Sequence, residues 1–217
     1  MAKAKGPKAK AAKPKAKKPA KSKDTISRTP VVKKGKLFVF SGTSGSGKTT
    51  IAEALLKQLP MFQRVVTCTT RAPREGEKDG MDYHFISREK FDDYVRRDML
   101  LEHAEVYGNY YGSLKREAEA ILASGKSVLL VIDVQGAMTI KKKFPEAILV
   151  FIKAPSLEVA KQRLLKRAKD APSVVEERML TAQLEMRFEP EFNYSVINDG
   201  LGVAIADARR IVSREAD

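Results

Sequence analysis

The segment that decides the fold is LFVFSGTSGSGKT, residues 37–49. Its first four residues are large and apolar, which is typical of a buried strand. The remainder matches the pattern G-x-x-x-x-G-K-[ST], and residues 48–58 continue with apolar side chains at helical spacing. A strand, a glycine-rich loop and a helix in this order predict a phosphate-binding loop, because glycines let backbone N–H groups converge on an anion beside a helix N-terminus.

Each part of the loop has a predicted role in holding a nucleoside triphosphate. The backbone donors are expected from Gly42, Thr43, Ser44, Gly45, Ser46 and Gly47. Lys48 would place a mobile cation near the β- and γ-phosphates, and the Thr49 hydroxyl would be a ligand of Mg²⁺. We therefore predict an ATP site with Mg²⁺ as cofactor. The loop by itself leaves the phosphoryl acceptor open.

Apolar runs alternate with helical patterns over the rest of the chain. The pattern predicts strands at 64–67, 83–86, 100–106, 127–133, 147–153 and 195–198. It predicts helices at 87–98, 113–123, 134–143, 156–168, 174–188 and 201–214, the second of them capped by Ser113. This alternation favours a three-layer α/β fold with a central parallel sheet. The short strands between residues 64 and 112 break the alternation and suggest an inserted antiparallel piece.

The charge of the chain is concentrated in one segment. The net charge is +14, but residues 1–36 contain 14 of the 41 basic residues and one of the 27 acidic residues. The remainder has 27 basic and 26 acidic residues, so the expected folded part is nearly neutral. Residues 1–34 are rich in Lys, Ala and Pro, and we predict that they are disordered. They could contact nucleic acid or another polyanion weakly, or could be an extension without a partner.

Cysteine content and hydropathy indicate a compartment. Cys68 is the only cysteine, so no internal disulfide can form, and we expect it to be a small buried residue. The basic N-terminus is not followed by the apolar core of a secretory signal, and no apolar run has the length of a membrane span. These features predict a cytoplasmic location and no membrane contact. The oligomeric state is left open.

A second group of residues has the chemistry of an acceptor site. Arg71 and Arg74 are three residues apart beside turn residues and can converge on one phosphate. Tyr83 and Tyr111 can donate phenolic hydrogen bonds to the same phosphate, although both could instead be core aromatics. Glu102 can accept hydrogen bonds from the N1–H and N2–H₂ edge of guanine, which adenine lacks.

These residues belong to longer motifs that resemble the guanylate kinases. The matching stretches are the loop at 42–49, TTRxPRxGExxGxDYxF at 69–85, GNYYGS at 108–113, IDxQG at 132–136, and three arginines, Arg163, Arg167 and Arg178. The resemblance spans about residues 35–214. It implies a core (35–66, 115–156 and 190–217), a GMP-binding insert (67–114) and a helical lid (157–189). It implies ATP and GMP as substrates, with use of dGMP left open.

The resemblance also implies roles for single residues. The GMP ligands would be Thr67, Arg71, Arg74, Glu77, Tyr83, Glu102, Tyr111, Ser113 and Asp133, with Glu77 in a supporting role. The catalytic residues would be Lys48, Arg74, Arg167 and Arg178, and Arg163 would contact ATP. Where some relatives carry an acid two residues before Asp133, this chain has Val131, which puts more weight on Asp133.

Two other classes of function compete with GMP phosphorylation. A kinase for another nucleoside monophosphate would share the phosphate loop, but Glu102 and the two arginines favour GMP. A guanylate-kinase-like module that only binds peptides is disfavoured, because such modules have lost the phosphate loop and this chain keeps Gly42, Gly47, Lys48 and Thr49.

Overall fold

The computed structural model describes residues 1–3, 6, 35–166 and 172–216, and among these the side chains of 172–174 are outside the description. The chain divides into two units, Met1–Val31 and Val32–Asp217. The fold below is that of the second unit. Most of the segment predicted to be disordered, 1–34, and the predicted site residue Arg167 lie outside the described residues.

A five-stranded parallel sheet forms the centre of this unit. Its strand order is β2-β7-β1-β8-β9, and all neighbours run parallel. The strands are β1 (Leu37–Gly42), β2 (Phe62–Arg64), β7 (Ser127–Val131), β8 (Ile148–Lys153) and β9 (Tyr194–Ile197). The predicted α/β fold is confirmed. Because β1 lies in the middle of the sheet, the loop after it opens at the centre of the carboxyl edge, where ligands bind in such sheets.

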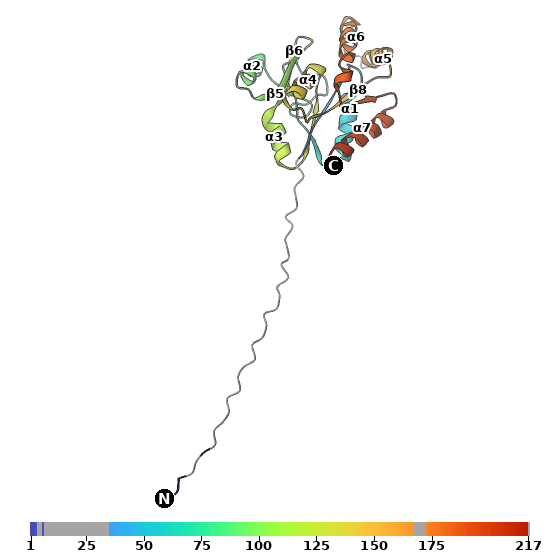
Figure 1. Ribbon diagram of the computed structural model, residues 1–217. Helices are drawn as coiled ribbons and strands as arrows, with labels where there is room; N and C mark the ends of the chain where they lie inside the picture. Colours follow the sequence, from blue (N-terminus) through green and yellow to red (C-terminus); the bar gives the residue numbers. More distant parts are fainter. Residues whose placement is uncertain (4–5, 7–34, 167–171, 217) are drawn as a thin grey trace. The chain divides into compact units, whose positions relative to one another are not determined.

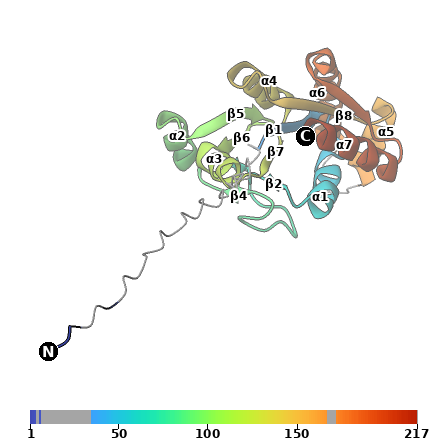
Figure 2. The ribbon, with the colours of Figure 1, turned by 60° about the horizontal axis from the view of Figure 1, so that its bottom comes forward.

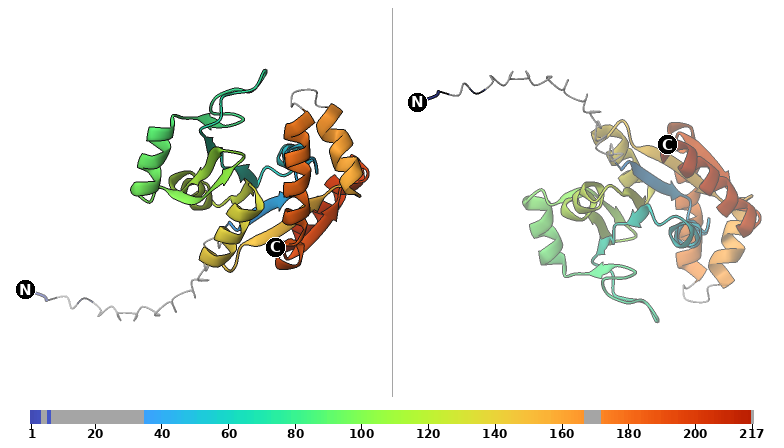
Figure 3. Two further views of the ribbon diagram at one scale, coloured as in Figure 1. Left: turned by 90° about the horizontal axis from the view of Figure 1, so that it is seen from above. Right: turned by 90° about the horizontal axis from the view of Figure 1, so that it is seen from below.

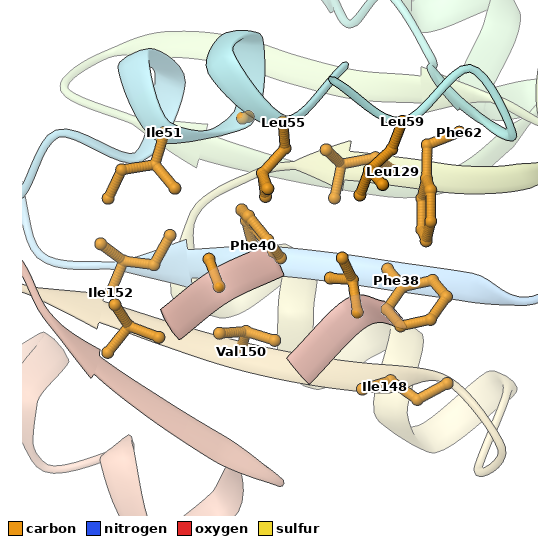
Figure 4. Packing of buried hydrophobic residues seen from close by; sticks show 14 of the residues in the cluster. Phe38, Phe40, Ile51, Leu55, Leu59, Phe62, Leu129, Ile148, Val150 and Ile152 are labelled. Carbon is orange, nitrogen blue, oxygen red and sulfur yellow. The ribbon is translucent and has the colours of Figure 1, made fainter. Parts of the chain in front are cut away.

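Helices α1 (Lys48–Gln58) and α7 (Leu201–Ala216) cover one face of the sheet (Figures 1 and 2). Phe38 and Phe40 alternate along β1 and point to this face, where they pack with Ile51 and Leu55 of α1. Figure 4 shows these side chains meeting between helix and strand. The packing holds the start of α1 against β1, so the loop between them is anchored at both ends.

Helices α3 (Lys115–Ala123) and α4 (Val134–Lys143) cover the opposite face. Leu37 and Val39 of β1 point to this side and pack in one cluster with residues of both helices, among them Ala118 and Ile140. Successive side chains of β1 therefore pack into two cores, one on each face of the sheet, which explains why its first four residues are all apolar.

A second sheet has four strands in the order β4-β3-β6-β5. The strands are β3 (Cys68–Thr69), β4 (His84–Phe85), β5 (Leu100–Val106) and β6 (Asn109–Leu114), and α2 (Arg88–Arg96) packs on them. The predicted insert is confirmed as a separate small sheet, but its pairing is mixed: β3 and β4 run parallel, and the other pairs are antiparallel. Cys68 is buried in this small core, and burial raises the pKa of its thiol to about 12.

Helices α5 (Leu157–Lys166) and α6 (Pro172–Met186) lie side by side (Figure 3). The 3₁₀ helix η1 (Glu189–Glu191) follows α6. Among the described residues, no helix combines the length and the apolar character that a membrane crossing requires.

Two predicted elements were wrong in detail. The expected strand at 64–67 is divided: β2 ends at Arg64 in the central sheet, and β3 begins at Cys68 in the small sheet. Ser113 does not cap a helix, because it lies within β6, a strand that the sequence pattern did not predict, and α3 begins two residues later. Its hydroxyl instead donates to Glu102 on the neighbouring strand.

Candidate active site

One cavity of about 220 Å³ opens between the phosphate loop, the small sheet and α6. Most of the predicted site residues line it: Ser44, Gly45, Ser46, Gly47, Lys48, Thr49, Thr67, Arg71, Arg74, Tyr83, Glu102, Tyr111, Asp133 and Arg178. Five other predicted site residues are not part of its lining: Gly42, Thr43, Glu77, Ser113 and Arg163. The cavity therefore joins the phosphate loop and the acceptor residues, which the sequence separates by some 20 to 90 positions.

Two glycines shape the phosphate loop where side chains cannot fit. Gly42 has φ +128°, and a Cβ there would lie 2.0 Å from the carbonyl oxygen of Ile152. Gly47 has φ +88° and precedes the first residue of α1. The Lys48 ammonium donates to the carbonyl oxygens of Gly42 and Thr43, at 2.7 and 2.9 Å. Gly42 and Thr43 thus hold the lysine inside the loop.

Glu102 is the most deeply buried acid of the cavity. Only 2% of it is exposed, and its Oε1 accepts a hydrogen bond of 2.7 Å from the Ser113 hydroxyl. Burial raises the pKa of this carboxyl to about 7; the Ser113 hydrogen bond opposes the shift, and the nearby charge of Asp133 adds to it. Its other oxygen has a close neighbour in Gly136, where a Cβ would lie 2.5 Å from Oε2. The glycine of IDxQG therefore leaves room for this carboxylate.

Asp133 caps a helix in addition to lining the cavity. It is the N-cap of α4, and its carboxylate accepts hydrogen bonds from the N–H groups of Gln135 and Gly136, at 3.0 and 3.2 Å. Burial raises its pKa, while these hydrogen bonds and the charge of Lys48 oppose the rise. Its charge thus acts on Glu102 on one side and on the phosphate loop on the other.

Glu77 does not line the cavity but accepts hydrogen bonds from the two arginines that do. Both of its oxygens accept hydrogen bonds of 2.9 Å from the Arg71 guanidinium, and one also accepts from the Arg74 backbone N–H at 2.7 Å. The Arg71 guanidinium carbon lies 5.4 Å from the ring centre of Tyr83, which in turn meets Tyr111 edge to face at 6.0 Å. Two arginines and two tyrosines therefore lie together on one side of the cavity: Arg71, Arg74, Tyr83 and Tyr111.

The predicted arginines of α5 and α6 differ in position. Arg178 lines the cavity from α6. Arg163 does not reach the lining, because its guanidinium donates to the Asn198 carbonyl oxygen at 2.9 Å. The Asn198 side chain is buried and donates to the Ser46 carbonyl oxygen at 2.8 Å. In this arrangement Asn198 links Arg163 to the phosphate loop.

Comparison with known proteins decides the family. The family model described as guanylate kinase matches residues 34–215. The chain belongs to the guanylate kinase family. A guanylate kinase of Clostridium perfringens is 43% identical over 182 residues, covering 84% of each chain, and one of Dechloromonas aromatica is 45% identical over 82% of this chain and 88% of its own. The crystal structure of guanylate kinase from Anaplasma phagocytophilum superposes with a TM-score of 0.72 at 32% identity, covering 85% and 87% of the two chains.

This member of the guanylate kinase family has cavity residues that the sequence motifs did not indicate. Glu185 of α6 accepts a hydrogen bond of 3.2 Å from the Ser44 N–H of the phosphate loop. Burial raises the pKa of Glu185, and the charge of Lys48 opposes the rise. Tyr107 and Val131 also line the cavity. Glu185 could not be found from sequence, because it is one of several acids on its helix and only the fold brings it to the loop.

The oxygen ligands in the cavity suit a hard divalent cation. The Thr49 hydroxyl and the carboxylates of Asp133 and Glu185 share the lining. Within the described parts of the chain, no cluster of three or more His, Cys, Asp or Glu side chains is arranged to hold a metal by itself. Mg²⁺ fits this sparse oxygen set, because it keeps several waters and binds through one or two protein ligands together with substrate phosphates.

Proposed function

We propose that this chain transfers the γ-phosphoryl group of ATP to GMP, giving ADP and GDP. The observation that carries the proposal is the shared cavity. The phosphate loop lines one part of it, and the acceptor wall, formed by Arg71, Arg74, Tyr83, Glu102 and Tyr111, lines another. Family membership supports the same reaction. An oxygen of the GMP phosphate is already anionic, so the reaction needs no strong base, and positioning and charge neutralisation supply the catalysis.

On the donor side, the loop at 42–49 would hold the triphosphate. Backbone N–H groups and the start of α1 offer a positive concavity, and Lys48 adds a full charge next to it. Thr49, with Asp133 and Glu185 nearby, would hold Mg²⁺ on the phosphates, where the ion neutralises charge and orients the oxygens.

On the acceptor side, Arg71, Arg74, Tyr83 and Tyr111 would bind the GMP phosphate, and Glu77 would hold Arg71 in place. Glu102 would read the guanine edge, with Thr67 beside it and Ser113 orienting its carboxylate. A buried carboxylate with a fixed partner rejects a base that lacks paired N–H donors, because its lone pairs would be left without hydrogen bonds.

Transfer itself would depend on arginines from both walls. Arg74 would bind both the GMP phosphate and the phosphoryl group in transfer. Arg178, which reaches the cavity from α6, would neutralise negative charge on the phosphoryl group. We assign Arg167 and Arg163 to the same helical lid, which would exclude water on closure. The division into core (35–66, 115–156, 190–217), GMP-binding insert (67–114) and lid (157–189) is part of this proposal.

A panel of nucleoside monophosphates tests the function. The full chain is incubated with ATP and GMP, dGMP, AMP, CMP, UMP or dTMP, and ADP release is measured with Mg²⁺ and with a chelator. We expect phosphorylation of GMP, none of comparable rate with AMP or the pyrimidine nucleotides, and no activity without Mg²⁺. Equal rates with AMP would reject the role of Glu102, and inactivity with every acceptor would reject the proposed function.

Glu185 occupies part of the phosphate loop that the ATP phosphates require. Its carboxylate accepts from the Ser44 N–H, and two anions compete for that donor. Changing Glu185→Gln keeps the size of the side chain and removes the charge. Without Mg²⁺ and without GMP, we expect ATP to bind about three- to tenfold more tightly, because a competing charge near the phosphates is lost. Titration calorimetry measures this, with Glu176→Gln on the exposed side of α6 as the control. With Mg²⁺ present the gain should disappear or become a loss, because the same carboxylate would help to hold the ion. Unchanged affinity both with and without Mg²⁺ would contradict both roles of Glu185.

We also propose that residues 1–34 contact polyanions such as nucleic acid. The support is their charge alone, since nearly all of the net charge of the chain lies in residues 1–36. A mobility shift of RNA or DNA at low salt should disappear when residues 1–34 are deleted. The absence of a shift with the full chain would end the proposal. The cytoplasmic location stays a prediction.

A further inference from the structure

Tyr107 has an unusual place in the turn between β5 and β6. It is one of two residues other than glycine with positive φ among the described residues, at +52°, a conformation that a Cβ disfavours. The other is Asp98, at the end of α2 and outside the cavity lining. Unfavourable backbone conformations cluster at active sites and ligand-binding sites, where they can fix the direction of a side chain. Here the side chain in question is that of Tyr107, which lines the cavity.

The side chain of Tyr107 contacts the opposite wall. The Arg178 guanidinium carbon lies 5.4 Å from the centre of its ring, within the range of a cation–π contact. Burial raises the pKa of its phenol, and a hydrogen bond with the Thr181 side chain opposes the rise. Figure 1 shows the β5–β6 hairpin and α6 facing each other at the top of the molecule. Tyr107 therefore connects the acceptor wall to α6 across the cavity.

The contacted residues share one face of α6. Arg178, Thr181 and Glu185 follow at intervals of three and four residues, which places them in a row along the helix. Glu185 of this row reaches the phosphate loop through Ser44. The row thus meets the acceptor wall at one end and the donor loop at the other. Arginine has many rotamers, so a ring held against the guanidinium reduces the number of orientations that Arg178 must lose before reaction.

We propose that Tyr107 is a positioning residue for phosphoryl transfer, holding the Arg178 guanidinium in the cavity from the acceptor wall. The inference rests on the proposed function, because it assigns Arg178 a task in transfer. Tyr107 acts through Arg178 and makes the orientation of that arginine depend on the β5–β6 turn lying against α6. No motif of the sequence indicated this role.

A double-mutant cycle with Arg178 tests the inference. kcat and both KM values are measured for the full chain and for Tyr107→Leu, Tyr107→Phe, Arg178→Ala and the double variant Tyr107→Leu/Arg178→Ala. Leu and Phe both keep the Cβ, so the backbone conformation is equally disfavoured throughout. We expect Tyr107→Leu to lower kcat about five- to twentyfold with KM values nearly unchanged, and Tyr107→Phe to retain most of kcat because the ring remains. In the Arg178→Ala background, the change to Leu should have almost no effect.

Tyr110 supplies the matched control. It belongs to the same hairpin, but its ring packs on Phe91 and under Arg88, and its hydroxyl donates to Glu105. Tyr110→Phe should leave kcat unchanged. Equal losses from Tyr107→Leu with and without Arg178, or a loss confined to KM, would overturn the inference while the chain still phosphorylates GMP. An unmodified chain that does not phosphorylate GMP would instead overturn the proposed function, and this inference with it.

Discussion

Replacing Lys48 by alanine is expected to lower kcat for GMP phosphorylation about a hundred- to a thousandfold, the usual loss when a charge-stabilising donor is removed. The Lys48 ammonium is held by two carbonyl oxygens of the phosphate loop, so its charge lies at the place where the donor phosphates would bind. The acceptor residues Arg71, Arg74 and Glu102 come from other elements of the structure. GMP binding without ATP should therefore change less than twofold.

The measurement combines steady-state kinetics with calorimetry of GMP binding. Lys57→Ala is the matched control, because Lys57 lies in the last turn of the same helix and is exposed. The two variants should have similar melting temperatures, since Lys48 is not part of the apolar core. Unchanged kcat in Lys48→Ala, or an equal loss of GMP binding, would contradict the donor role.

Replacing Glu102 by glutamine should lower kcat/KM for GMP about a hundred- to a thousandfold. The amide keeps the shape of the side chain but exchanges one acceptor for a donor. Ser113 already donates to one oxygen of Glu102, so the guanine edge would face an NH₂ group or leave that serine without a partner. The same kinetic assay with ATP and GMP measures the loss. Glu105→Gln, on the exposed side of the same strand, should retain full activity.

The same substitution should stabilise the protein without ligands. The pKa of Glu102 is about 7 in the folded chain against an ordinary value of 4.5, because burial disfavours its charge. Between these two pH values the folded chain retains a proton that the unfolded chain releases. Stability contributed by this group is therefore greatest below pH 4.5, falls as the pH rises to 7, and is lowest above it.

Glutamine carries no charge and removes this penalty. At pH 8 we expect Glu102→Gln to raise the free energy of unfolding by about 1 to 3 kcal/mol, with little difference at pH 4.5. Thermal melting across this pH range measures it. A variant that loses GMP use and is also less stable at pH 8 would indicate damage to the fold rather than a lost contact with guanine.

Local sequence determined the donor half of the site and most of the elements around it. The loop at 42–49 could be located because strand, glycines, lysine and helix are contiguous, and each contributes through its own backbone or side-chain chemistry. The buried strands β1, β7 and β8 and the helices α1 and α4 were predicted for the same reason, since their apolar periodicity is a local property. The acceptor residues were recognised by motif, and their chemistry alone suggested a phosphate and a guanine.

Only the tertiary structure decided which side chains meet. Ser113 looked like a helix cap, but its strand neighbour is Glu102, and that pairing depends on a register between β5 and β6 that no local pattern encodes. Arg163, which we predicted as a lid arginine, donates to the Asn198 carbonyl oxygen, a partner that no local pattern indicated. Glu185 and Tyr107 have no local signal, because their partners, Ser44 and Arg178, lie more than 70 positions away and reach them only when α6 packs over the cavity.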